Sequence, residues 1–387
     1  MIDLTPTRSS WSSGVATPGW HAAWFAFVAM LALPLPCRAQ HPGDIAAWPE
    51  TTDTPCASVD APRRADCEAR EAERDAERSR TSRDYHAWLA DRLAEDGSAR
   101  DLAIAAHLRA MSISGTLYET GDSLPSLDKD TRLAAWVQRA TREGPDDPLV
   151  HMLLNRRFST SDTMRLAALH AQWARIEPGN VVPLMFAAET ERPRASALPI
   201  RSPTASRFDL HYNALLLAVI DAFERHPPGA NRAAVLFGGD VPTLYSYASS
   251  MAMAMLQLPR FIDTIDACRG DALVSAPERR TDCQQLGHLL ADDSDTLIAH
   301  MMGLALLVRA SDTPCERAAA EERRRQAGWL MHEWRVLSDD QAIQADETAS
   351  RQALSSTQDE MSYMRVILQH HGIATEPAPD WKHVPLP

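Results

Sequence analysis

The chain has 387 residues, of which 45 % are hydrophobic, enough for one large domain or two smaller ones with a sizeable core. Ala, Leu, Arg and Glu are abundant and β-branched runs are scarce, which favours helix throughout. The formal net charge of −13 argues against a nucleic-acid partner, which needs a basic face, and against docking on anionic lipid.

The longest uninterrupted apolar run, residues 22–36, is shorter than the roughly 20 residues that a membrane-spanning helix requires. It is followed by "CRAQ", in which the small residues Cys37 and Ala39 occupy the −3 and −1 positions of a cleavage site. We therefore predict that residues 1–39 are a cleaved secretory signal, and that the mature chain has no membrane span and resides in the periplasm or cell envelope. Because Arg8 is the only strong positive charge before the apolar run, the alternative is an uncleaved membrane anchor.

After the signal, residues 40–62 are rich in Pro, Thr and Asp and predict an extended lead-in. An N-terminal helical part follows over residues 63–190. Its beginning, 68–80, is almost free of large apolar side chains, and Glu71 and Arg74 are spaced to face each other on a helix. This pattern predicts a solvated helix; the alternative, a partner-binding arm, lacks an apolar stripe.

Periodicity and breakers predict helices at about 64–95, 98–117, 129–142, 147–156, 162–176, 181–190, 207–225, 241–257, 259–269, 276–291, 295–310, 314–337 and 339–371. Three prolines within residues 191–206 mark a linker between the N-terminal part and a C-terminal helical part, 207–372. Residues 373–387 are predicted to form an irregular tail.

Capping signals mark several helix ends. Thr313 and Glu316 have the spacing of a capping box, and Ser275 and Glu278 have the same spacing. Gly270 follows a predicted helix end, where a left-handed residue is favoured. These signals agree with the periodicity and strengthen the helical prediction.

Two segments of the C-terminal part, 208–223 and 296–308, are apolar on nearly every side, which is typical of central helices. The segment 245–258 is rich in small residues that allow close packing. Met251 and Met255 share one of its faces; a copper-binding methionine box is conceivable, but filling gaps in a core is the usual role of methionine.

A weak internal repeat links residues 142–154 and 176–188. Each combines a helix end, a Pro/Gly/Asn turn and an apolar restart, and their prolines, Pro148 and Pro183, are 35 residues apart. The turn "EPGN" resembles the one that closes a tetratricopeptide unit, although the Trp, Gly, Tyr and Ala spacing inside such units is not met. The resemblance implies an all-α fold of stacked antiparallel helix pairs, like an α-α superhelix, as one continuous array or two helical subdomains.

Cys268 and Cys283 lie at the end of one predicted helix and in the second turn of the next. Zinc would need two further ligands, and the nearest, His288, falls off that helix face. A redox pair would usually show C-x-x-C. A structural disulfide needs only an oxidising compartment and two facing helices, and it is the favoured prediction.

Cys56 and Cys67 are the next pair, predicted to tie the lead-in to the first helix. Cys315 is then left over. Five cysteines that form two bridges have many possible partners, so the sequence leaves the pairing of Cys315 open.

Other groups of polar residues carry little specific chemistry. The adjacent His370 and His371 point about 100° apart on a helix and chelate one ion poorly. The cluster "ADDSD" (291–295) lacks the alternating ligands and central glycine of a calcium loop, and "LFGGDVP" (236–242) lacks a phosphate-loop signature. We predict no catalytic, cofactor-binding or metal site.

Two functions are compatible with these features. The favoured one is a non-enzymatic binding or scaffold module of the bacterial cell envelope, whose stacked helices bind a protein or peptide partner. The alternative is an exported, hydrolase-like helical enzyme whose site is built from residues distant in sequence. Its candidate residues are Asp292, Asp293, Asp295, His370 and His371.

Overall fold

The computed structural model describes residues 56, 60–114, 127, 129–155, 163–191, 204–237, 244–338 and 346–382, which belong to one compact unit. These residues form sixteen α-helices and no strand, which confirms the all-α prediction. None of these helices is long and apolar enough to cross a membrane. The predicted signal, 1–39, lies outside the described residues.

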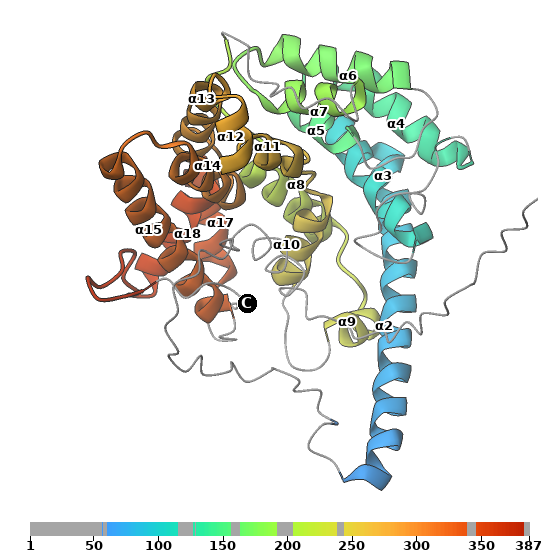
Figure 1. The fold of residues 1–387 in the computed structure, drawn as a ribbon. Coiled ribbons are helices and arrows are strands. Elements are labelled where there is room, and N and C mark those ends of the chain that lie inside the picture. The colour runs from blue at the N-terminus through green and yellow to red at the C-terminus, as the bar shows by residue number, and fades with distance from the viewer. Residues whose placement is uncertain are drawn as a thin grey trace, which may run out of the picture. The chain divides into compact units, whose positions relative to one another are not determined.

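The helices follow in the order α2 (Ala61–Asp96), α3 (Ala99–Ser114), α4 (Thr131–Glu143), α5 (Pro148–Leu154), α6 (Thr163–Ile176), α7 (Val182–Glu191), α8 (Tyr212–Arg225), α9 (Ala230–Phe237), α10 (Leu244–Met255), α11 (Phe261–Ala267), α12 (Gly270–Ser275), α13 (Arg279–Asp292), α14 (Leu297–Ala310), α15 (Pro314–Ser338), α17 (Glu347–Ser356) and α18 (Glu360–His370) (Figure 1).

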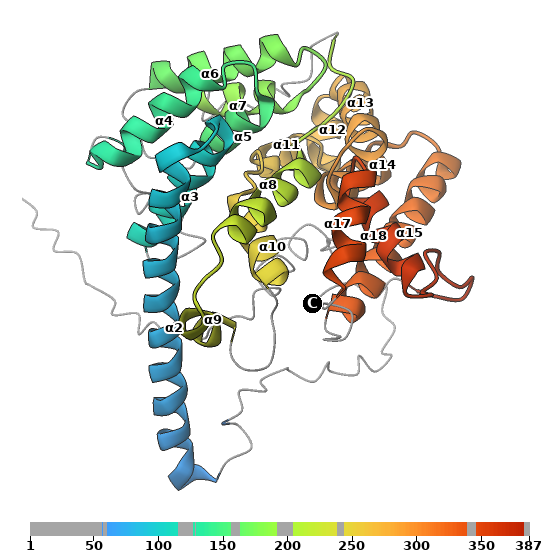
Figure 2. The ribbon, with the colours of Figure 1, turned by 180° about the vertical axis from the view of Figure 1, so that it is seen from behind.

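Neighbouring helices along the chain pack against each other. The pairs α2–α3, α3–α4, α6–α7, α13–α14 and α14–α15 make the main consecutive contacts (Figures 1 and 2). Helices distant in sequence also meet, because α8 packs on α10 and α17, and α15 packs on α18. Helix pairing is therefore present, whereas the tetratricopeptide-like stacking and the division into two subdomains stay predictions.

An aromatic cluster joins α2, α8 and α10. The ring of Phe223 lies edge-on to those of Tyr85 and Tyr247, with centroids 5.7 Å away in each case. Edge-to-face geometry is favoured by the quadrupoles of the rings. Met251 and Met255 on α10 are fully buried in the core, as the gap-filling interpretation requires.

The contact between α13 and α14 depends on glycine. A Cβ atom on Gly303 would lie 2.4 Å from the backbone nitrogen of Ala291 and 2.6 Å from the carbonyl oxygen of Gly287. Only a residue without a side chain therefore permits this approach of the two backbones. Most of α14 is buried, as expected for a central helix.

Several predicted boundaries are wrong. The helix predicted over 339–371 is divided into α17 and α18, because Asp359 caps α18 by accepting the backbone N–H of Ser362 at 2.8 Å. The helix predicted from residue 207 begins only at Tyr212. The loop predicted at 270–275 is the short helix α12, and α9 was not predicted.

One capping box is confirmed and one is wrong. Thr313 Oγ1 accepts the N–H of Glu316, and Glu316 Oε2 accepts the N–H of Thr313, both at 3.2 Å. Ser275 instead ends α12, where its hydroxyl donates to the carbonyl of Asp271. Gly270 opens α12 with ordinary backbone angles and is not a left-handed terminus.

The start of the predicted tail lies against α15. Arg325 donates to the carbonyl of Ala378 at 3.1 Å, and the indole N–H of Trp329 donates to the carbonyl of Ala374 at 2.9 Å. The ring of Trp381 meets that of Trp329 edge-on at 5.4 Å. Residues 372–382 are irregular, as predicted, but are held on the helix surface.

Candidate functional site

The two predicted cysteine pairs lie at disulfide distance. The sulfurs of Cys268 and Cys283 are 2.08 Å apart and their Cα atoms 5.9 Å apart. Both residues are fully buried. The bond links the end of α11 to α13 and encloses α12, so it fixes a three-helix corner.

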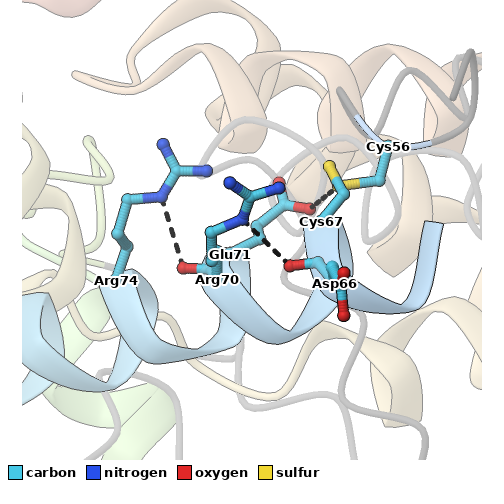
Figure 3. Close-up of a disulfide and its surroundings, with 6 residues drawn as sticks. All are labelled: Cys56, Asp66, Cys67, Arg70, Glu71 and Arg74. Atoms are coloured by element: carbon cyan, nitrogen blue, oxygen red, sulfur yellow. Dashed lines mark hydrogen bonds between the residues drawn. A yellow bond between two sulfur atoms is a disulfide. The ribbon is translucent and has the colours of Figure 1, made fainter. Parts of the chain in front are cut away.

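The second pair, Cys56 and Cys67, holds the chain that precedes α2 against the second turn of this helix (Figure 3), with sulfurs 1.99 Å apart. Glu71 Oε2 lies 3.4 Å from Cys56 Sγ. A disulfide sulfur carries no proton, so this contact is a hydrogen bond only when the bond is reduced. The expected ion pair between Glu71 and Arg74 does not form among the described residues; Arg74 donates instead to the carbonyl of Arg70.

The remaining thiol, Cys315, is free and exposed in the first turn of α15. The candidate enzyme residues do not converge. Asp292 binds His288 and Arg323 on the surface. His370 binds Asp346 at 2.9 Å and stands beside the ring of His371.

The adjacent acidic residues have other surroundings. The carbonyl of Asp293 accepts the N–H of Phe208, and the side chain of Asp295 is buried. Asp293 is exposed, whereas Asp295 belongs to a buried polar region that the residues of the chain before α8 complete. We call residues 204–212, with the side chains that bind them, the junction.

In the junction, an irregular segment runs between two helical turns. Arg207 forms an isolated parallel bridge with Asn180 in the α6–α7 turn, and Phe208 forms another with Ser294 in the α13–α14 turn. The segment thus connects the N-terminal and C-terminal helical parts through backbone hydrogen bonds.

Glu177 is the centre of the first half of the junction. Its Oε2 accepts hydrogen bonds from Trp173 Nε1 at 2.7 Å, His211 Nε2 at 2.9 Å and Asn180 Nδ2 at 3.1 Å. Its Oε1 accepts one from Arg207 at 2.7 Å. Burial raises the pKa of this carboxyl, but the donors outweigh burial and lower the pKa to about 2.

His211 has a backbone conformation that is uncommon for any residue but glycine, with φ 58° and ψ 39°. Asp209 Oδ1 accepts its backbone N–H at 2.8 Å and lies 3.3 Å from its Nδ1. The imidazole therefore lies between two carboxylates, those of Asp209 and Glu177. Burial lowers the pKa of His211, but these carboxylates outweigh it and raise the pKa.

Asp295 is the acceptor for the end of the junction that leads into α8. Its two carboxyl oxygens accept the backbone N–H groups of Leu210 at 2.9 Å and Tyr212 at 2.8 Å. These hydrogen bonds explain why α8 begins at Tyr212. Burial, together with the negative charge of Asp209, raises the pKa of Asp295 to about 8.

Glu360 extends the same arrangement to α18. Its Oε2 accepts the N–H of Leu297 at 2.7 Å, and its own N–H donates to the carbonyl of Asp295 at 2.9 Å. Burial raises its pKa to about 7. The junction therefore links the turn before α7 and the starts of α8, α14 and α18.

Glu177, Asp209 and His211 could supply ligands to a metal ion, since their candidate ligand atoms lie within 4.8 Å of one another. The same atoms already bind Arg207 and the imidazole N–H groups. The guanidinium and a protonated His211 balance the two carboxylates, so the charges are compensated within the chain. A cation would have to displace Arg207, and we assign no metal to this cluster.

The sequence did not identify this cluster. Glu177 and Asn180 belong to the "EPGN" turn, which was interpreted only as a helix-to-helix turn. Arg207, Asp209 and His211 were placed in the first turns of the helix predicted over 207–225. No family model, curated protein or solved structure matches the chain, so the interpretation of the junction depends on its geometry.

Proposed function

We propose that this protein is a non-enzymatic binding or scaffold module of the bacterial cell envelope, whose packed helices present a surface to a protein or peptide partner. The observation that carries the proposal is the Glu177 carboxylate, which accepts four hydrogen bonds from its own chain. A carboxylate whose hydrogen bonds are all made within its own chain holds the elements that supply the donors in fixed positions. A rigid surface loses less entropy when it binds.

The location proposed for this function is supported by the disulfides. Structural disulfides such as Cys56–Cys67 and Cys268–Cys283 are typical of oxidising compartments, including the periplasm. The secretory signal predicted over residues 1–39 also supports export to the periplasm or cell envelope.

The experiment begins with photo-crosslinking in the envelope and identification of the linked protein. The purified partner is then titrated with the wild-type chain, with Glu177→Ala and with His370→Gln. We expect saturable binding, weakened at least tenfold by Glu177→Ala, which removes the hydrogen bonds of this carboxylate, and unchanged by the surface variant His370→Gln. Absence of a saturable partner, or equal affinity for all three chains, would contradict the proposal.

A second candidate is an exported, hydrolase-like enzyme, and His211 is the observation that favours it. A non-glycine residue in the left-handed region, held between two carboxylates, is a type of strained residue that is frequent at active sites. The wild-type chain, His211→Gln and His370→Gln would be assayed on peptide, ester and glycan substrates. Turnover that is lost only in His211→Gln supports an enzyme, and turnover that survives this substitution excludes the site.

A further inference from the structure

The segment that follows α18, residues 373–382, lies on α15 and bends there into a tight turn. The backbone N–H of Trp381 donates to the carbonyl of Ala378 at 3.0 Å, and Pro379 occupies the second position of this turn. Proline favours that position because its ring fixes φ near the value that the turn requires. The local sequence therefore favours the turn independently of its contact with the helix.

Arg325 on α15 binds both ends of the turn. Its Nη1 atom donates to the carbonyl of Ala378 at 3.1 Å and to that of Trp381 at 3.3 Å. Its Nε and Nη2 atoms donate to the two carboxyl oxygens of Glu322, at 2.7 Å and 2.8 Å. This bidentate pair fixes the plane of the guanidinium group, so α15 itself holds Nη1 in position for the turn.

Two aromatic side chains of α15 hold the residue that ends the turn. The ring of Trp381 meets that of Trp329 edge-on at 5.4 Å and lies tilted to that of His332 at 6.4 Å. The indole N–H of Trp329 also donates to the carbonyl of Ala374 at 2.9 Å. In the hydrogen bonds of Arg325 and Trp329 to the segment, α15 supplies the donors and the segment supplies carbonyl oxygens. A proline-containing peptide keeps these acceptors although its prolines lack N–H groups.

The residues that contact the segment belong to a longer stripe on α15. Arg325, Trp329, His332 and Val336 follow one another at intervals of four, three and four residues, which places them on one face of the helix. The contacts described above end at His332, one turn before Val336, and the side chain of Val336 is 51 % exposed. A ligand longer than the segment can therefore gain apolar contact on the same face.

The segment covers this face from the outside and is not part of the core. Its residues Ala374, Ala378, Pro379 and Asp380 are exposed, and Trp381 is half-buried. The helices beneath are held by other contacts, because α15 packs directly on α14 and α18. The segment can therefore leave the face while these helices stay packed.

A glycine directs the segment onto α15. Gly372 ends α18 with φ 71°, its N–H donates to the carbonyl of Gln369, and the N–H of Ile373 donates to that of Leu368 at 2.9 Å. This is the hydrogen-bond pattern of a Schellman terminus, which requires a residue in the left-handed region. The direction of the segment thus depends on a position that other residues occupy with strain.

We propose that the face of α15 formed by Arg325, Trp329, His332 and Val336 binds a partner protein through a proline-containing turn that ends in an aromatic residue. The chain's own segment 373–382 occupies this face until the partner displaces it. The inference rests on the proposed binding function and names the class of peptide that is recognised. Tryptophan and arginine are the side chains that most often dominate protein interfaces.

The tether decides between the two sources of such a turn. The chain's own segment competes at a high effective concentration, because it is attached to α18. The same segment of a second copy offers identical contacts without that attachment, so it does not displace the first. A ligand on another protein succeeds only with contacts that the segment lacks, and the exposed Val336 provides the surface for them.

The test is fluorescence anisotropy of a labelled peptide of residues 373–382, titrated with the full mature chain. Two variants open the face: Trp381→Ala removes the ring that packs on Trp329, and Gly372→Val places a β-branched residue where φ is 71°. We expect saturable binding of the peptide to both variants. The affinity should be at least about tenfold higher than for the wild type, whose tethered segment competes.

Further substitutions identify the contacts. In the Trp381→Ala chain, adding Trp329→Ala should weaken peptide binding by at least about tenfold, and adding Trp136→Ala should leave it unchanged. Trp136 is the matched control, because it is a half-buried tryptophan on α4 with the guanidinium of Arg132 over its ring at 5.4 Å. A peptide that carries Pro379→Ala should bind more weakly, because its turn is no longer preformed.

The partner found by photo-crosslinking supplies a second readout. It should bind the Trp381→Ala chain more tightly than the wild type, and Val336→Asp more weakly. Val274→Asp is the control, since Val274 is an exposed valine on α12. A partner whose affinity none of these variants changes would dock elsewhere; this result would overturn the inference and leave the proposed scaffold function standing.

Two other results would also overturn the inference. One is peptide binding that is absent from both opened chains or is the same with and without Trp329. The other is a wild-type dimer in analytical ultracentrifugation that Trp329→Ala dissociates, because it would assign the face to a second copy of the chain. We expect the wild type to sediment as a monomer.

Discussion

Asp295 accepts the backbone N–H of Tyr212 at 2.8 Å, so the first turn of α8 is capped by a carboxylate 83 residues further along the chain. Glu360 caps Leu297, the first residue of α14, in the same way, and the carboxylate of Glu189 accepts a backbone N–H at the start of α11. None of these helices has a capping side chain at its own N-cap. Their free N–H groups are satisfied by carboxyl oxygens from other elements.

Replacing Asp295 with alanine should lower the free energy of unfolding by about 2–4 kcal/mol, because two buried N–H groups lose their acceptor. Urea denaturation near pH 6.5 measures the change. The control is Asp292→Ala, which removes a surface ion pair and should change stability by less than about 1 kcal/mol. A similar small loss for both variants would show that Asp295 does not cap α8.

Stability should depend on pH and be greatest near pH 6.5. The pKa of Asp295 is about 8 and that of Glu360 about 7, both above their unfolded values near 4. The native state therefore retains protons that the unfolded chain releases, and the stability that these protons provide is lost as pH rises through 7 and 8. The raised pKa of His211 acts in the same direction. Between pH 6.5 and 8.5 the loss should be about 3 kcal/mol.

Below pH 6.5, stability should instead fall as the pH is lowered. Burial lowers the pKa of His86, His170 and His300 from 6.5 to about 4. Between pH 6.5 and 4 the imidazoles bind protons in the unfolded chain but stay neutral in the native state. Their contribution to the free energy of unfolding is therefore present above pH 6.5 and is lost as pH falls towards 4. Three imidazoles outweigh the two carboxyl groups in this range. Asp295→Asn should flatten the alkaline limb and His300→Gln the acid limb; a monotonic profile in urea would contradict the assignment.

The two disulfides should differ in their effect on stability. Replacing Cys268 and Cys283 with serine should lower the free energy of unfolding by about 2–4 kcal/mol, because the bond closes a 15-residue interval across buried packing. Replacing Cys56 and Cys67 should change global stability by less than about 1 kcal/mol, since the first five turns of α2 are largely exposed. Loss of the Cys56–Cys67 disulfide should instead speed amide hydrogen exchange near the start of α2.

Cys315→Ser provides the control for both pairs, because this thiol is exposed and free. Peptide mapping without reductant identifies the linked cysteines. Equal loss of stability for the two double variants would contradict the difference in burial, and free thiols at Cys268 and Cys283 in periplasmic protein would exclude that bond.

Gly303→Ala should destabilise the protein by about 1–3 kcal/mol, because the new methyl group would meet backbone atoms of α13 that cannot move aside. Gly270→Ala is the matched control, since a Cβ atom there has no neighbour within 4 Å. Thermal or urea unfolding of the two variants tests the difference. A neutral Gly303→Ala would show that α13 and α14 can separate without cost.

Local signals in the sequence predicted much of the fold. The capping box of Thr313 and Glu316 and the apolar pattern of 296–308 correspond to α15 and α14 because their causes lie within a few residues. Helix α12 was missed because it has only six residues, too few to show a periodic pattern. It is stabilised by packing of Leu273, which is buried. Tertiary contact decides such a segment, and propensity does not.

The junction could not be predicted for a similar reason. His211 binds Glu177 across 34 residues, and Leu210 binds Asp295 across 85. Neither spacing is periodic, and no motif identifies the partner. Of the clusters that the sequence did display, the adjacent His370 and His371 lie at the surface, where His370 binds Asp346, and the cluster 291–295 contributes the buried Asp295 to the junction. Proximity in sequence was thus a poor guide to which polar residues the fold brings together.

Capping from a distance also has a consequence for how the chain is made. During synthesis α8 emerges long before Asp295, and α14 emerges before Glu360, so each helix start remains without its acceptor until a later segment has left the ribosome. The nascent chain can form early turns but cannot complete these two helices in their native environment. A product that stops before residue 360 would lack the side-chain acceptor of the Leu297 amide, which the finished chain supplies. The native starts of α8 and α14 are therefore completed only by segments translated later, the α13–α14 turn for α8 and α18 for α14.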